Sequence, residues 1–262
     1  MRSEHGGGVP DSTAFAQTLR TMRQEGSCIL VVGPASSSAH REICHRLAGE
    51  LGTESRQRIL VDVLDDASTA PTEGGEGLTV QIHRGRRPPD EGQRGATETS
   101  GAGRGTNDAG RGTNDERQRT ADAGESGAVV QSPLLSTIGA AVLETVDEVA
   151  DETDLDSADL RLCFDAVTPM LDGHEPQTVF RLLHMLTSRT RELRGIGHFH
   201  LPLERDDDYV RLLQPLFDAV VEIRRSEDGD ERTGELEQRW SLRDHDGDSG
   251  WLSLEDESVS RD

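Results

Sequence analysis

The segment from Ser27 to Gly33 restricts the possible folds more than any other part of the chain. It reads Ser-Cys-Ile-Leu-Val-Val-Gly, a continuous apolar run that ends in a glycine. A strand that is buried on both faces of a parallel sheet has this pattern, because neither face meets water. A polar turn over residues 34–38 follows, and then a helical pattern with Ile43 and Leu47 on one side. The order strand, glycine turn, helix predicts an α/β fold.

Similar patterns predict the rest of the elements. Further strands are expected over residues 58–63, 78–83, 160–165, 196–201 and 219–223, and helices over residues 11–25, 133–150, 177–193 and 209–217. Two alternating segments, Glu237–Arg243 and Ser249–Leu254, flank an Asp-Gly turn and predict a hairpin. Together these patterns predict a wound, mostly parallel sheet with an antiparallel C-terminal hairpin.

We expect the chain to divide into four parts. These are a first part of the α/β domain (1–84), a disordered insertion (85–130), a second part of the α/β domain (131–225), and the hairpin with an acidic tail (226–262). Residues 85–127 contain no Val, Ile, Leu, Met, Phe, Tyr, Trp or Cys, while ten of them are Gly. Such a segment cannot bury enough apolar surface to offset the cost of ordering its backbone. It also contains a tandem repeat, Ala102–Asp108 followed by Ala109–Asp115, which is typical of a tolerant surface loop.

The charge balance indicates a salt-adapted protein. The chain of 262 residues has 50 acidic and 28 basic residues, a net charge of −22, and every basic residue is arginine. Strong acidity without lysine is typical of a halophilic cytoplasm. In molar salt the Debye length falls to roughly 3 Å, which screens the repulsion among these carboxylates.

The same composition narrows the class of partner. Nucleic acids bind clustered cations, and the arginines of the insertion (seven) are outnumbered there by acids (eight), with no aromatic residue to stack on a base. No apolar segment is long enough for a membrane span or a signal peptide. We therefore expect a cytoplasmic protein that binds another protein, with a homo-oligomer as an open alternative, and that binds neither nucleic acid nor membrane.

The glycine turn is the place where α/β proteins bind phosphate, because free amides and the dipole at a helix start favour an anion. A working loop reads G-x-x-x-x-G-K-[ST]. The window that starts at Gly33 instead has Ser38, Ala39 and His40 at the positions of the second glycine, the lysine and the hydroxyl residue. Ala39 cannot neutralise the phosphates, and His40 is a poor ligand for Mg²⁺. The candidate nucleotide contacts that remain are Gly33, Ser36, Ser37, Ser38 and Asp165.

Histidine and cysteine residues are the other candidates for chemistry. His198 and His200 lie two apart on a predicted strand, so their rings face the same side and can share a metal. The sequence shows no third ligand nearby, so we expect no metal site and two histidines satisfied by backbone and side-chain partners, with a shared metal as the alternative. Cys28, Cys44 and Cys163 are widely spaced among apolar residues, which indicates reduced core thiols and not a disulfide or zinc framework.

These features resemble the RecA/KaiC ATPase superfamily. In that superfamily the acid that ends the Walker-B-like strand orients the magnesium-bound water, and Asp165 matches its place, although an acid there also commonly caps the next turn. The resemblance implies a second acid as the base for water, where Asp65 and Asp66 stand. The chain is most similar to a haloarchaeal family of unknown function related to KaiC-like proteins. The stretches that carry this similarity are Leu30–Gly33, Arg161–Asp165, Gly195–Pro202 and Phe217–Arg224.

Three functions follow as expectations. The first is a non-hydrolysing RecA/KaiC-like domain without a cofactor, which serves as a regulatory or protein-interaction module and is not an enzyme. The second is a divergent nucleotide-binding switch that holds ATP or a related ligand with the backbone amides of residues 36–39. The third is a metal-dependent enzyme built on His198, His200 and Asp165.

Overall fold

The computed structural model describes residues 12–48, 56–63, 78–85, 119–122, 125–132, 134–226, 235–245 and 247–254. The strands are β1 (Ser27–Val32), β2 (Gln57–Val63), β3 (Leu78–Gly85), β4 (Arg119–Asp122), β5 (Glu125–Ser132), β6 (Leu160–Asp165), β7 (Ile196–Leu201), β8 (Ala219–Arg225), β9 (Leu236–Leu242) and β10 (Leu252–Ser253). The helices are α1 (Ser12–Glu25), α2 (Ser37–Ala48), α3 (Leu135–Glu152), α4 (Val167–Gly173), α5 (Pro176–Glu192) and α6 (Asp208–Leu213). Among these described residues, no helix is both long and apolar enough to cross a membrane.

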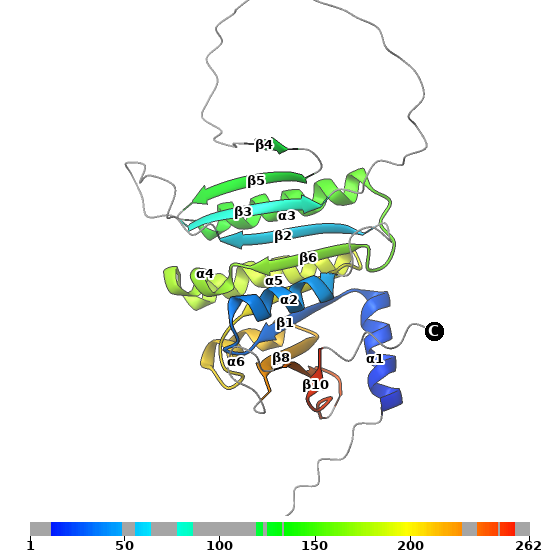
Figure 1. Cartoon of the computed structure of the whole chain (residues 1–262). Coiled ribbons are helices and arrows are strands. Elements are labelled where there is room, and N and C mark those ends of the chain that lie inside the picture. The colour runs from blue at the N-terminus through cyan, green and yellow to red at the C-terminus, as the bar shows by residue number, and fades with distance from the viewer. Residues whose placement is uncertain are drawn as a thin grey trace, which may run out of the picture.

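The described strands form one mixed sheet in the order β10-β9-β8-β1-β7-β6-β2-β3-β5-β4 (Figure 1). The five central strands, from β8 to β2, are parallel to one another. Antiparallel strands extend the sheet at both ends. The α/β class, the buried strand β1 and the C-terminal hairpin are confirmed.

The expectation of a mostly parallel sheet holds only for the five central strands, because β3 pairs antiparallel with β2 and begins a second antiparallel edge. A parallel neighbour needs a crossover, usually a helix, whereas an antiparallel neighbour needs none. Residues 64–77, between β2 and β3, contain no apolar helical repeat. The orientation of β3 could therefore have been read from the connection.

The predicted disordered insertion over residues 85–130 is too long. Its last part contributes β4 and most of β5, and residues 86–118 lie outside the described residues. Strand β5 reaches the apolar triplet at 128–130 and pairs with β3, and β4 then pairs with β5. Backbone pairing of this kind needs no apolar side chains, so a composition argument does not detect it.

Helix α4 was not predicted either. Pro169 lies in its first turn, where proline removes no intrahelical hydrogen bond and is tolerated.

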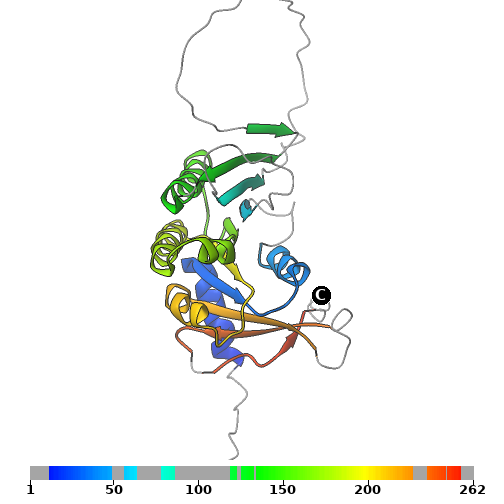
Figure 2. The ribbon, with the colours of Figure 1, turned by 90° about the vertical axis from the view of Figure 1, so that its left-hand side faces the viewer.

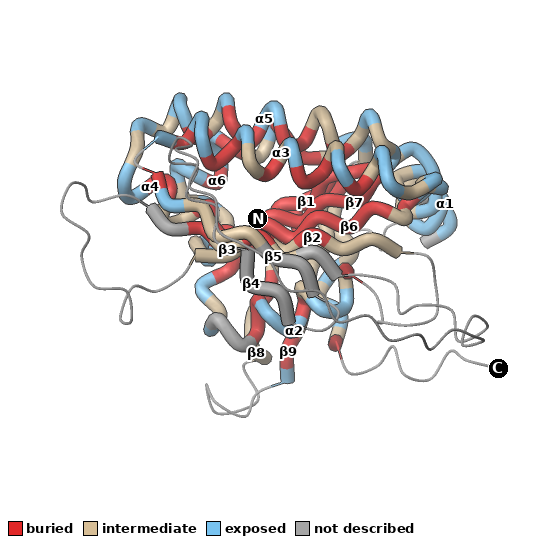
Figure 3. Tube along the Cα trace, turned by 90° about the horizontal axis from the view of Figure 1, so that it is seen from above, coloured by how far each residue is buried: buried red, intermediate tan, exposed pale blue. Residues whose placement is uncertain are grey.

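The helices cover the two faces of the sheet unequally. Helices α3 and α5 lie on one face and α2 on the other, as Figures 2 and 3 show. The first face carries the larger apolar cluster, where Phe199 contacts Phe164 and Phe217 with ring centroids 5.5 and 5.2 Å apart. The second face carries a smaller cluster that includes Ile43 of α2 and Val31 of β1, with α1 packed against it. Alternation along β7 therefore sends Phe199 to one face and its neighbours to the face under α2.

Candidate functional site

The turn that follows β1 is folded onto groups of the protein itself. Gly33 has a φ of +125° and its amide donates to the carbonyl oxygen of Leu203 at 2.8 Å. A Cβ atom at this position would overlap the carbonyl oxygen of Ile223 in the neighbouring strand β8. The first glycine of the phosphate-loop pattern is thus explained by a close approach of two backbone segments, with no ligand needed.

The described side chains of the remaining loop residues place two of the phosphate-loop positions inside the protein. Ser36 is exposed, and its carbonyl accepts the amides of Ala39 and His40 at 2.9 and 3.1 Å. Ser37 and Ser38 start α2, and their side chains lie outside the described part of the structure. Ala39 and His40, which stand where a working loop has lysine and a hydroxyl residue, are 0% and 3% exposed. Both of these positions face the protein interior.

His40 connects the loop to strand β7. Its Nε2 lies 2.9 Å from the carbonyl oxygen of Gly33, and its Nδ1 lies 3.2 Å from Nδ1 of His200. A carbonyl oxygen only accepts, so Nε2 of His40 carries the proton. Burial lowers the pKa of His40, which favours the neutral ring with a lone pair on Nδ1. His200 must then donate from Nδ1, and its own Nε2 is left with a free lone pair.

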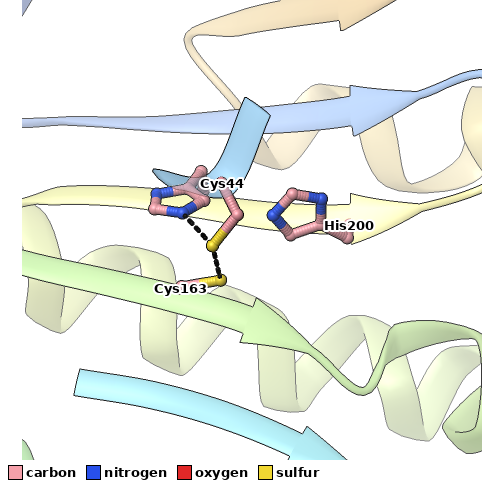
Figure 4. A group of neighbouring side chains, drawn as sticks. Cys44, Cys163 and His200 are labelled. Atoms are coloured by element: carbon pink, nitrogen blue, oxygen red, sulfur yellow. Dashed lines mark hydrogen bonds between the residues drawn. The ribbon is translucent and has the colours of Figure 1, made fainter. Parts of the chain in front are cut away.

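Four side chains of the metal-binding type meet beside this histidine pair (Figure 4). The Sγ atoms of two cysteines and one ring nitrogen from each of two histidines lie within 4.8 Å of one another. We call this group the Cys/His cluster; its members are Cys44 of α2, Cys163 of β6, and His198 and His200 of β7. The two histidines are 0% and 1% exposed, Cys163 is buried and Cys44 is partly buried. The prediction that both histidines face the same side of one strand is confirmed.

Contacts inside the cluster set its protonation. Sγ of Cys44 lies 2.7 Å from Sγ of Cys163 and 3.2 Å from Nε2 of His198. Hydrogen bonding to Cys163, followed by hydrogen bonding to His198, lowers the pKa of Cys44. Burial raises the pKa of Cys163, and burial lowers the pKa of His198. A thiolate at Cys44 and a neutral imidazole at His198 are the forms in which these side chains bind metals.

The three cysteines are free thiols, as expected, but only Cys28 is isolated in the core. Cys28 is the core thiol that was expected: its Sγ donates to the carbonyl oxygen of Thr187 at 3.6 Å, and burial raises its pKa to about 12. Cys44 and Cys163 are free thiols too, as expected, but they are not isolated among apolar residues, because their sulfur atoms lie within 4.8 Å of each other and of a ring nitrogen of each histidine. A signal was present in the sequence, since His40 and Cys44 are four residues apart and share one face of a helix.

The expectation that neighbouring partners satisfy both histidines is met for only one ring nitrogen of each. Nδ1 of His198 and Nε2 of His200 are buried and have no hydrogen-bond partner among the residues that the structure describes. Asp165 is exposed at the end of β6 and is not a member of the Cys/His cluster. Asp65 and Asp66 lie outside the described residues.

Comparison with known protein families identifies the family of the chain. A sequence model described as a family of unknown function (DUF7504) matches residues 26–223. This range contains β1, the phosphate-loop turn and all four members of the Cys/His cluster. No curated protein matches the chain.

Proposed function

We propose that this chain, which belongs to the family of unknown function DUF7504, is a non-hydrolysing RecA/KaiC-like domain that acts as a regulatory or protein-interaction module in a haloarchaeal cytoplasm. The observation that carries the proposal is the burial of Ala39 and His40. The two positions whose side chains would contact phosphate and magnesium in a working loop are packed inside the protein. The scaffold of strand, glycine turn and helix is retained, while the means to bind and hydrolyse ATP are gone.

Further contacts favour this function over a nucleotide-binding switch. A switch that uses the backbone amides of residues 36–39 needs them free, but the amide of Ala39 already donates to the carbonyl oxygen of Ser36. The chain also contains no lysine that could take the place of the phosphate-loop lysine. The fold is retained while Ala39 and His40 of the loop are buried. This combination is consistent with a function that depends on the surface of the domain.

The proposal predicts that the protein does not turn over ATP. Purified protein in molar KCl with Mg-ATP is expected to release phosphate no faster than a blank without protein, and titration calorimetry with ATP or ADP is expected to show no binding heat. Asp165→Asn should leave both results unchanged, because its carboxylate has no magnesium-bound water to orient. Magnesium-dependent turnover that disappears in Asp165→Asn would contradict the proposal.

A further inference from the structure

We propose that the Cys/His cluster binds one Zn²⁺ ion through all four of its side chains and thereby fixes α2 on the sheet. This inference goes beyond the proposed function and does not rest on it. The donor set is the first argument: two sulfurs with two imidazole nitrogens in a compact group are typical of tetrahedral structural zinc sites. Because four protein ligands leave no position for water or substrate, the site is structural, and this argues against a metal-dependent enzyme at this place.

The unpartnered nitrogen of His200 is the second, independent argument. The hydrogen-bonded chain from Gly33 through His40 leaves the lone pair of His200 on Nε2. That atom is buried without a hydrogen-bond partner among the described residues, and Figure 4 shows the ring of His200 directed toward Cys44. A buried acceptor without a donor costs free energy, and a cation bound in the cluster removes that cost.

Two distances between donor atoms of the cluster can be compared with those that zinc requires. With Zn–S bonds of about 2.3 Å and Zn–N bonds of about 2.0 Å, a tetrahedral site places its sulfurs roughly 3.8 Å apart and its sulfur and nitrogen atoms roughly 3.5 Å apart. Sγ of Cys44 is 3.2 Å from Nε2 of His198, which needs little change. The two sulfurs are 2.7 Å apart and must separate by about 1 Å, which a small rotation of the partly buried Cys44 side chain provides.

The surroundings of the cluster have the organisation of a metal site. A histidine that binds a metal usually donates its other ring N–H to a fixed acceptor, which sets the tautomer and the ring orientation. His200 has such an acceptor in Nδ1 of His40, and His40 is fixed in turn by the carbonyl of Gly33. His40 is therefore a positioning residue for the zinc site. Position 40, where a working phosphate loop has its magnesium-binding hydroxyl residue, thus holds a histidine that is hydrogen-bonded to a zinc ligand.

Elemental analysis of the purified full chain tests the zinc site directly. Protein prepared without a metal-affinity tag and dialysed in molar KCl is expected to contain about one zinc per chain, falling below about a tenth in Cys44→Ala and in His198→Ala. Matched controls are Cys28→Ala, a buried cysteine outside the cluster, and His45→Ala, an exposed histidine next to Cys44. Both controls should keep the zinc. Wild-type protein without zinc, or ligand variants with undiminished zinc, would overturn the proposal.

Cobalt substitution tests the same site on unaltered protein, so that a variant that fails to fold does not decide the question. Wild-type protein refilled with Co²⁺ is expected to show the intense visible bands of a tetrahedral ion and a thiolate-to-cobalt charge-transfer band. A weak octahedral spectrum without the charge-transfer band overturns the assignment. A disulfide between Cys44 and Cys163, detected by mass spectrometry of the untreated native protein, overturns it as well.

The role of His40 gives a separate prediction. His40→Ala is expected to weaken zinc binding by about 10- to 100-fold, because the acceptor that orients His200 is lost while all four ligands remain. Competition with a chromophoric chelator measures the affinity, and the cobalt charge-transfer band shows whether the ligand set is unchanged. Arg41→Ala, an exposed neighbour on α2, is the control and should bind zinc as the wild type does. An unchanged affinity in His40→Ala would show that His40 does not position the site.

Discussion

Replacing Gly33 with alanine is expected to lower the free energy of unfolding by at least about 3 kcal/mol. Two costs add up at this residue. The φ of +125° is one that residues with a Cβ rarely adopt, and the new Cβ would overlap the carbonyl oxygen of Ile223. That oxygen belongs to β8, which is hydrogen-bonded to β1, so it cannot move away without disturbing the centre of the sheet. Urea denaturation in molar KCl measures the loss.

Gly173→Ala is the matched control for this experiment. Gly173 ends α4, and a Cβ atom placed there meets no atom within 4 Å. Its substitution should change the free energy of unfolding by no more than about 0.5 kcal/mol. If the two variants prove equally stable, the close approach between the glycine turn and β8 is not as the structure has it.

The sequence predicts those parts of the fold whose burial requires a run of apolar residues. Strands β1, β6, β7 and β8 are apolar because helices or the second apolar cluster cover both of their faces. Strand β4 leaves no such mark, since it joins the sheet through backbone pairing with β5 alone among the contacts described for it. Helix α4 has only seven residues and contains a proline, so its period is too short to recognise.

The sequence predicts the two histidines of the candidate site but not the two cysteines that join them. The i, i+2 spacing of His198 and His200 is a local pattern, and it placed both rings on one face correctly. Their partners come from elsewhere: Cys44 and Cys163 are 119 positions apart, without the short Cys-x-x-Cys spacing that identifies zinc sites in a sequence. Tertiary structure brings them together when α2 packs on β6 and β7. A single sequence does not contain that information.

The closed phosphate loop now has a physical explanation that composition could not supply. An acidic composition without lysine does not by itself require serine at position 38 or histidine at position 40. The structure gives one of these residues a role, because His40 bonds Gly33 and His200 at the same time. The hydrogen bonds of His40 therefore connect the turn after β1 to the Cys/His cluster.

A lysine at position 39, where a working phosphate loop has one, is expected to destabilise the protein without producing ATP binding. Ala39 is fully buried in the second apolar cluster with Ile43 and Ile223. Ala39→Lys would force a long side chain and an unpaired charge into that cluster, and we expect the free energy of unfolding to fall by at least about 3 kcal/mol. Urea denaturation in molar KCl measures the fall, and calorimetry with Mg-ATP is expected to show no binding.

Arg41→Lys is the control that separates burial from the mere presence of lysine, because Arg41 lies on the same helix and is exposed. It should retain wild-type stability within about 0.5 kcal/mol. If Ala39→Lys folds with wild-type stability and binds ATP, its side chain must reach a phosphate position in solvent. The loop would then be an open site that lacks one charge, and the proposal of a non-hydrolysing module with a closed loop would be wrong.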